Sequence, residues 1–249
     1  MKLVKVHVQN YRSILDSGEI EIEKIKTVLV GINEAGKTAL LKAINNLNPA
    51  SDIEKVDILR DFPRSKYSEY VQNKSAEELK KTPLVKGWFA LEQSDIVEIE
   101  ILPNFVDKLI DSNNFLYIRN QKYDSCSHEI QNFPKTTFGD IRKSTLRLIE
   151  ALKINPTSQE IITAIESFLE KNKYDVLTIS EQDSKEFIQF LEKSELKINE
   201  DNDKEINRIA ELTQLAKKNI FHAELLEFLN KKLPKFIYFN NYIKVKPII

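Results

Sequence analysis

One stretch, residues 26–47, constrains this chain more than any other, because an apolar run, a glycine-bearing loop and a helical pattern follow one another there. Residues 27–30, TVLV, are β-branched and apolar, which predicts a buried strand. Residues 31–38, GINEAGKT, match the pattern G-x-x-x-x-G-K-[ST]. Apolar residues then recur at helical spacing, at Leu40, Leu41, Ile44 and Leu47. The order strand, loop, helix is the setting in which this pattern forms a phosphate-binding loop.

Each position of this loop has a chemical role in holding phosphate. Backbone N–H groups of a tightly turned loop point at phosphate oxygens, and glycines such as Gly31 and Gly36 permit the turn. The helix that follows adds its positive dipole end. We expect Lys37 to reach the β- and γ-phosphates and the hydroxyl of Thr38 to bind Mg²⁺. The alternative is an ordinary glycine turn between a strand and a helix. The remaining residues of the predicted nucleotide site are Asn33, Glu34, Ala35 and Ala39.

Composition sets the class of protein. The chain has 249 residues, enough for one large or two small domains, and its net charge of −1 gives no overall field toward nucleic acid or acidic membranes. Cys126 is the only cysteine, which excludes an internal disulfide and fits a reducing cytoplasm. The first ten residues alternate where a signal peptide would be apolar, and no run is long enough to cross a bilayer. We expect a soluble, cytoplasmic protein with no membrane partner.

Two short strands are predicted before the loop. Apolar and polar residues alternate over residues 4–9 and 19–23, which is the period of a half-buried strand. The sequence NYRS, at residues 10–13, ends the first of these strands. With residues 27–30, this places three strands in the first thirty residues and favours hairpin pairing at the edge of a mixed sheet.

The NYRS turn, the EIEI strand and the GINEAGKT loop together resemble the start of ABC-type ATPase heads in the SMC, RecF and RecN group. The resemblance is closest to AAA-type ATPases related to the OLD (overcoming lysogenisation defect) nucleases, and it is specific over residues 1–48. It implies an α/β fold, the N-terminal lobe of a P-loop NTPase, with ATP as the nucleotide and Arg12 approaching it. For partners it implies a second ATPase head or a further C-terminal lobe, and DNA through the complete assembly.

The rest of the first 135 residues is predicted to extend the sheet. Residues 84–91, 97–101, 115–120 and 123–130 each have the composition or period of a strand. Residues 61–64 read DFPR, which resembles a D-[FY]-P-R segment of family members and is otherwise a proline-turned connector. Cys126 and His128 could share a face of the last strand. We interpret them as two strand side chains and not as a pair of metal ligands.

From about residue 137 the period becomes helical. Four helices are predicted, around residues 141–152, 161–169, 184–191 and 206–229. Asp201 and Asp203 precede the last one, and we interpret them as a helix-start loop and not as a nuclease metal centre. After Pro234, residues 236–239 predict a strand that returns to the sheet. The resemblance compares it with the strand before the Q-loop, where Asn240 or Asn241 would face Mg²⁺; a simple turn is equally consistent.

These patterns divide the chain into a lobe at 1–135, a helical insertion at 136–232 and a returning strand at 233–249. Two parts of an ABC-type head are missing: an apolar strand ending in Asp-Glu, and a serine- and glycine-rich signature segment, since no glycine follows Gly139. We therefore expect a truncated ATPase that does not hydrolyse ATP alone. The resemblance implies full-length relatives that act in DNA processing or phage defence. The alternative is a non-catalytic nucleotide-binding or partner-binding remnant. A small GTPase or kinase is disfavoured, because a parallel α/β repeat and a base-specific loop are both missing.

Overall fold

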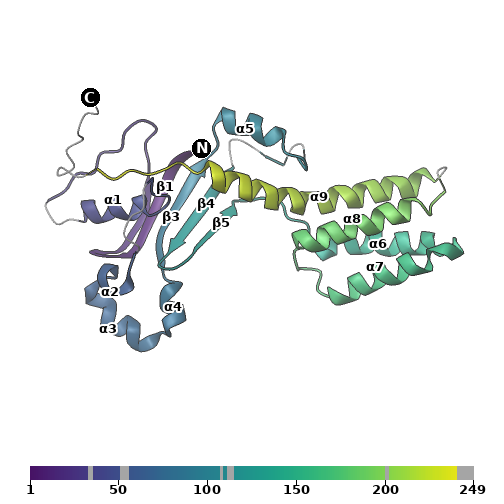
Figure 1. Ribbon diagram of the computed structural model, residues 1–249, viewed down its shortest axis with the longest axis horizontal. Coiled ribbons are helices and arrows are strands. Elements are labelled where there is room, and N and C mark those ends of the chain that lie inside the picture. The colour runs from purple at the N-terminus through teal and green to yellow at the C-terminus, as the bar shows by residue number, and fades with distance from the viewer. Residues whose placement is uncertain (33–35, 51–55, 107–108, 111–114, 200–201, 240–249) are drawn as a thin grey trace, which may run out of the picture. The chain divides into compact units, whose positions relative to one another are not determined.

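The computed structural model describes residues 1–32, 36–50, 56–106, 109–110, 115–199 and 202–239. They form two compact units (Figure 1). The sheet unit contains Met1–Ile96, Ser112–Gln131 and Leu229–Ile249. The helical unit contains Val97–Asp111 and Asn132–Phe228. Each unit has buried apolar side chains of its own, and each is described separately below.

The sheet unit is built on five described strands in the order β2-β1-β3-β4-β5, and every neighbouring pair is antiparallel. The predicted mixed sheet is therefore wrong for this part of the chain. Strands β1 and β2, and likewise β4 and β5, pair because the short turns between them allow only antiparallel pairing. The strands are β1 (Lys2–Tyr11), β2 (Ile14–Glu21), β3 (Pro83–Ala90), β4 (Leu116–Lys122) and β5 (Cys126–Ile130).

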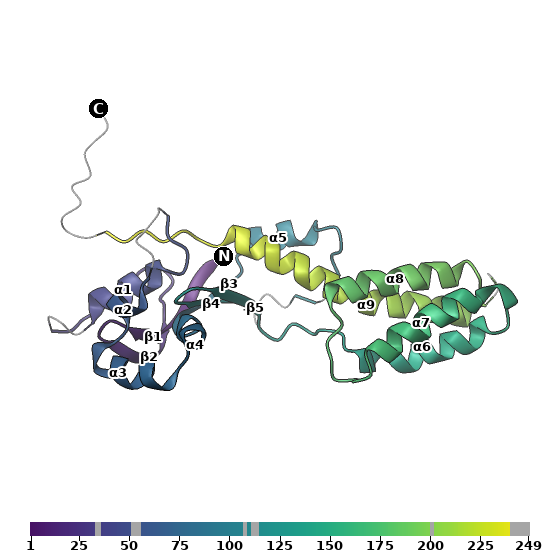
Figure 2. The same ribbon diagram turned by 60° about the horizontal axis from the view of Figure 1, so that its bottom comes forward.

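Helix α1 (Lys37–Asn45) lies beside β1, as Figure 2 shows, and buries Leu40 and Ala43 of its own length. Leu47, after the last turn, is fully buried, and a Cβ placed on Gly87 of β3 would lie 2.8 Å from Leu47 Cδ1. Gly87 thus permits the close approach of Leu47 to the sheet. Around one end of the strands run α2 (Ile58–Asp61), α3 (Arg64–Asn73) and α4 (Ala76–Lys80).

Two predicted strands are wrong. Residues 27–30 have no regular structure, and the side chains of Val28 and Val30 are 66% and 90% exposed. Their β-branched composition favours a strand, but a strand also needs a hydrogen-bonded neighbour, and no described strand lies beside them. Residues 97–101 lie in or next to α5 (Gln93–Glu100). Their alternation does not reflect burial, because Ile99 is buried while Val97 and Ile101 are exposed.

The helical unit confirms the four helices predicted after residue 137. They are α6 (Phe138–Leu152), α7 (Gln159–Lys171), α8 (Glu181–Glu195) and α9 (Asp203–Lys232), and the last four residues of α9 belong to the sheet unit. Thr137 and Asp140 form a capping box that starts α6. Asp203 begins α9, as the helix-start interpretation predicts, whereas Asp201 lies outside the described residues.

Residues 236–239 do not form the predicted returning strand. Phe236 makes a single parallel bridge with Pro49, in which Phe236 N donates to Asn48 O and Ala50 N donates to Phe236 O. This bridge lies after α1 and does not involve residues 27–30, so the predicted pairing is wrong. Asn240 and Asn241 lie outside the described residues.

Candidate nucleotide-binding site

The loop before α1 is shaped around Gly36. This residue has a left-handed backbone with φ of 84°, and its carbonyl accepts the first helical hydrogen bond from Leu40 N at 2.8 Å. A Cβ at this position would lie 3.3 Å from Ser13 Oγ and 3.5 Å from Ile14 Cγ1. Both the backbone angle and the crowding select glycine. The loop and the turn after β1 are therefore in contact.

Lys37 folds back over the loop. Its Nζ donates to Gly31 O at 2.7 Å and to Ile32 O at 2.6 Å. These two bonds hold the ammonium group over the loop that the sequence predicts to cradle phosphate. Thr38 is exposed in the first turn of α1, where its hydroxyl is open to a ligand, and Ala39 is buried beneath it. Asn33, Glu34 and Ala35 lie outside the described residues.

A cavity of about 440 Å³ opens at this loop. Its polar lining comes from Gly36 and Lys37 and from Ser13, Asp16 and Ser17 of the β1–β2 hairpin. Leu29 and other aliphatic side chains form the rest of the lining. The cavity thus combines an ammonium group and a helix start, which suit phosphate, with a carboxylate and an apolar surface, which do not.

Residues 10–13, which include the end of β1 and the turn after it, are held at two points. Asn10 and Arg12 both have left-handed backbones, with φ of 52° and 53°. The hydroxyl of Tyr123 donates to Asn10 O at 2.5 Å, and Arg12 N donates to Asp61 O at 2.6 Å. Left-handed residues other than glycine cost free energy, and such long-range bonds offset that cost.

Arg12 also bonds the side chain of Asp61, the first residue of DFPR. Its Nε donates to Asp61 Oδ1 at 3.1 Å, while Arg60 Nη2 donates to Oδ2 at 2.8 Å. Asp61 is only 1% exposed. Burial by itself raises the pKa of Asp61, but hydrogen bonds from Arg60 and Asp57 N, with the charges of both arginines, hold that pKa below its ordinary value. The carboxylate is charged at neutral pH.

Arg12 and Lys37 line different cavities. Arg12 borders a cavity of about 180 Å³, together with Arg60, Lys42 and Asn45. Asn45 is largely buried, and its Oδ1 has no hydrogen-bond partner among the described residues. The structure therefore joins the Arg12 turn to the Lys37 loop through Ser13 and Gly36, and does not bring the two cationic side chains into one cavity.

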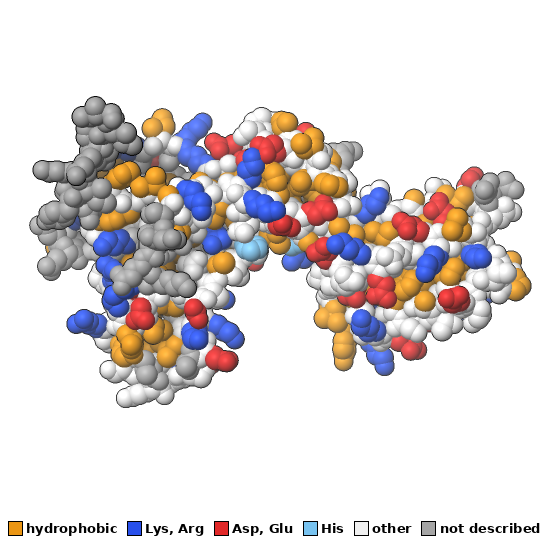
Figure 3. Space-filling model, in the orientation of Figure 1, with side chains coloured by type: hydrophobic (Ala, Val, Ile, Leu, Met, Phe, Trp, Pro, Cys, Tyr) orange, Lys and Arg blue, Asp and Glu red, His pale blue; other side chains and the backbone are white. Residues whose placement is uncertain are grey.

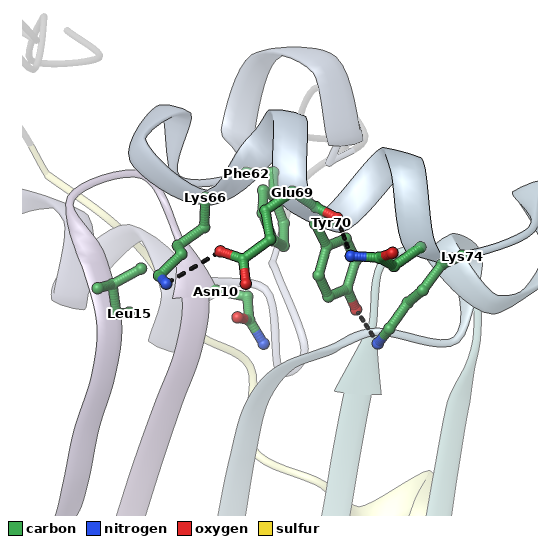
Figure 4. A pocket seen from close by; sticks show the side chains of 8 residues that line it. Asn10, Leu15, Phe62, Lys66, Glu69, Tyr70 and Lys74 are labelled. Atoms are coloured by element: carbon green, nitrogen blue, oxygen red, sulfur yellow. Dashed lines mark hydrogen bonds and ion pairs between the residues drawn. The ribbon is translucent and has the colours of Figure 1, made fainter.

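A third cavity, of about 400 Å³, lies between α3 and the ends of β1 and β2 (Figure 4). Lys66 and Glu69, both on α3, point toward each other, and their Nζ and Oε2 atoms lie 3.1 Å apart. Asn10 and Leu15 line its strand side, and Leu15 also lines the Lys37 cavity. The segment of residues 10–15 thus borders all three cavities, which makes it the structural junction of the site.

Cys126 and His128 do not add a metal centre. Cys126 is exposed as a free thiol, and His128 stacks on Tyr117 with ring centroids 6.2 Å apart. Burial and the charge of Arg119 lower the pKa of His128. Over the described ranges, no three His, Cys, Asp or Glu side chains gather as metal ligands do. No helix in those ranges has the length and apolar character of a membrane span.

Comparison with known proteins gives the family of this chain. A model of the AAA ATPase domain family matches residues 1–245, so the chain belongs to that family. The phosphonates import ATP-binding protein PhnC of Mycoplasma mycoides subsp. mycoides SC is 32% identical over 104 residues. PhnC of Mycoplasma capricolum subsp. capricolum is 30% identical over 104 residues. Each match covers 41% of this chain and 40% of the relative, so it spans less than half of either protein.

The sequence predicts Gly36 and Lys37 as site residues from a motif, and Arg12 through a resemblance. It does not predict the ion pairs of Asp61 with Arg12 and Arg60. The available signal was the DFPR segment, in which Asp61 stands next to an apolar residue and a proline. Asp61 is buried, and an aspartate is rarely buried without a charged partner. That partner, Arg12, lies 49 residues away in the sequence.

Proposed function

We propose that this chain is the ATP-binding lobe of an ATPase related to the OLD and SMC groups, with ATP and Mg²⁺ bound at residues 31–38. The observation that carries the proposal is the pair Gly36 and Lys37, a left-handed glycine at a helix start followed by a lysine held over the loop. This donor set fits a triphosphate, because amides at a helix N-terminus and an ammonium group both favour negative charge. The exposed hydroxyl of Thr38 fits a magnesium ligand.

The cation requirement tests this proposal directly. Binding of a fluorescent ATP analogue is measured with and without Mg²⁺, in the wild type and in Thr38→Ala. We expect Mg²⁺ to strengthen binding in the wild type and to have little effect in Thr38→Ala, because the variant lacks the hydroxyl ligand. Ser65→Ala, in exposed α3, is the control and should keep the wild-type response. Equal magnesium dependence in all three proteins would argue against the site.

We also propose that the site is completed by a second ATPase head or a further lobe. Ile25, Val28, Val30 and Ile32 are exposed large apolar side chains in the segment before the loop. Exposed apolar clusters of this kind mark interaction surfaces, and a β-branched segment is suited to pairing with a strand of a partner. In a complete ATPase, that partner would also supply the Asp-Glu pair at the end of an apolar strand and the signature segment, neither of which occurs in this sequence.

DNA processing or phage defence is proposed on the resemblance alone, with DNA bound by the complete assembly. Side chains of both signs are interspersed on the face in Figure 3, so that view offers no extended basic surface for a phosphate backbone. The single cysteine supports a cytoplasmic location. The second candidate is a nucleotide-binding or partner-binding module without hydrolysis. The same exposed apolar segment supports it, because partner binding needs no catalytic carboxylate.

A further inference from the structure

Asp61 contacts the turn of residues 10–13 through its backbone and its side chain. Its carbonyl accepts from Arg12 N at 2.6 Å, and its Oδ1 accepts from Arg12 Nε at 3.1 Å. The first bond holds the left-handed backbone of Arg12, and the second fixes the direction of its guanidinium. A single residue of the DFPR segment therefore sets both the main-chain and the side-chain conformation of Arg12.

Arg60 shares the same carboxylate without competing for the same oxygen. Its Nη2 and Nε donate to Asp61 Oδ2, which also accepts from Asp57 N at 3.2 Å. One buried negative charge thus lies between two guanidinium groups, which keep it paired. Arg12 and Arg60 line the same cavity, together with Lys42.

Phe62, the next residue of the DFPR segment, contacts the residue that holds Asn10 at the start of the turn. Phe62 is buried and its ring centroid lies 6.3 Å from that of Tyr123. Tyr123 in turn donates its hydroxyl to Asn10 O. Both the start and the middle of the turn are therefore fixed by the segment that begins at Asp61, and Ser13, next in the chain, touches Gly36 of the phosphate loop.

We propose that Asp61 is a positioning residue for the nucleotide site, acting through Arg12. It holds the guanidinium of Arg12 in one orientation before nucleotide arrives, and Arg60 keeps its carboxylate compensated throughout. This inference rests on the proposed ATP binding and on the approach of Arg12 to the nucleotide. Preorganisation lowers the entropy lost when a long side chain is ordered on binding, so the carboxylate raises ATP affinity without touching ATP.

A double-mutant cycle on ATP affinity separates positioning from general support of the fold. Calorimetry measures the dissociation constant of Mg-ATP for the wild type, Asp61→Ala, Arg12→Ala and the double variant. We expect Asp61→Ala to weaken binding about fivefold, the size of ordering one arginine. In the Arg12→Ala background the same substitution should have no further effect. Asp61→Asn, which keeps one acceptor oxygen, should fall between Asp61→Ala and the wild type. Glu150→Gln, in an exposed ion pair of α6, should match the wild type.

A nucleotide-free readout accompanies the cycle. The Nε–H signal of Arg12 in ¹⁵N NMR should exchange slowly with water in the wild type and rapidly in Asp61→Ala, because the hydrogen bond to Oδ1 is lost. Thermal melting of each variant checks that it is folded.

Three results would overturn the proposal. One is an equal loss of affinity from Asp61→Ala in both backgrounds, another is tighter binding by Asp61→Ala, and the third is rapid exchange of Arg12 Nε–H in the wild type. A wild type that binds ATP and gives any of these refutes only the role of Asp61. A wild type that binds no ATP refutes the proposed function, and the positioning role with it.

Discussion

Ser13 and Gly36 are in such close contact that a single added carbon on Gly36 would lie 3.3 Å from the Ser13 hydroxyl oxygen. This contact joins the turn after β1 to the start of α1. It fixes Gly36, at the start of α1, from the hairpin side, although residues 27–30 are not part of the described sheet. No other residue type can replace this glycine without strain, because its φ is 84°.

The substitution Gly36→Ala tests this contact. We expect it to lower the free energy of unfolding by about 1–2 kcal/mol, from the left-handed φ, and to abolish detectable ATP binding, because the added carbon pushes on Ser13. Gly18→Ala is a matched control, since Gly18 also has a left-handed φ, of 63°, but nothing within 4 Å of an added Cβ. It should cost about 1 kcal/mol and leave ATP affinity unchanged. Equal effects of both variants on ATP affinity would contradict the role of the contact.

Asn219 in α9 provides a test of the helical unit. Its Oδ1 accepts from Thr136 N, and its Nδ2 donates to Thr136 O and to Ile179 O, each at 2.9 Å and buried. Asn219→Ala leaves Thr136 N and Ile179 O without this partner, while Thr136 O still accepts from Ile179 N. We therefore expect the free energy of unfolding to fall by about 2–3 kcal/mol. Urea denaturation measures this free energy. The control is Gln189→Ala, at an exposed position of α8, which should change stability by less than about 0.5 kcal/mol. A loss as small as the control's would show that water replaces the amide.

His222 should make stability depend on pH. Burial, and then the charge of Lys135, lower the pKa of His222 from its ordinary value of 6.5 to about 4. The unfolded chain therefore binds a proton at higher pH than the folded chain. Stability from the neutral imidazole is present above about pH 6.5 and is lost as the pH falls toward 4. Urea denaturation of the wild type and His222→Gln at pH 7 and pH 5 measures this. We expect the wild type to lose up to about 2 kcal/mol more than the variant over this interval. Parallel losses in the two proteins would show that His222 is not the group responsible.

The chain alone should turn over ATP only at background rate. The loop supplies the ground-state cradle, whereas hydrolysis also needs a carboxylate to orient water and charge from a partner, each commonly worth about a hundredfold or more. A phosphate-release assay with and without DNA measures turnover. A rate near one per second, about the low end for such enzymes, that vanishes in Lys37→Ala would mean that a complete site exists in this chain.

The sequence predicts some parts of this structure well because their signals are local. The helix after Gly36, the β1–β2 hairpin and the helices from Thr137 onward each have a period or a cap that needs no distant partner. The strand predicted at residues 27–30 is wrong because β-propensity says nothing about whether a neighbouring strand is present. The strand predicted at residues 97–101 is wrong because the sequence SDIVEIE fits both a period of two and helical spacing. The Asp61–Arg12 bond joins residues 49 positions apart, and no local pattern encodes such a contact.

Lys37 gives the most direct test of the whole interpretation, because its ammonium group lies over the loop that is proposed to hold the phosphates. Isothermal calorimetry compares the dissociation constants of Mg-ATP for the wild-type chain and for Lys37→Ala. The control is Lys185→Ala, at an exposed position of α8. We expect Lys37→Ala to bind at least about tenfold more weakly, a loss of about 1.4 kcal/mol, and Lys185→Ala to bind as the wild type does. Equal affinities for the wild type and Lys37→Ala would contradict the assignment of this loop as the ATP site.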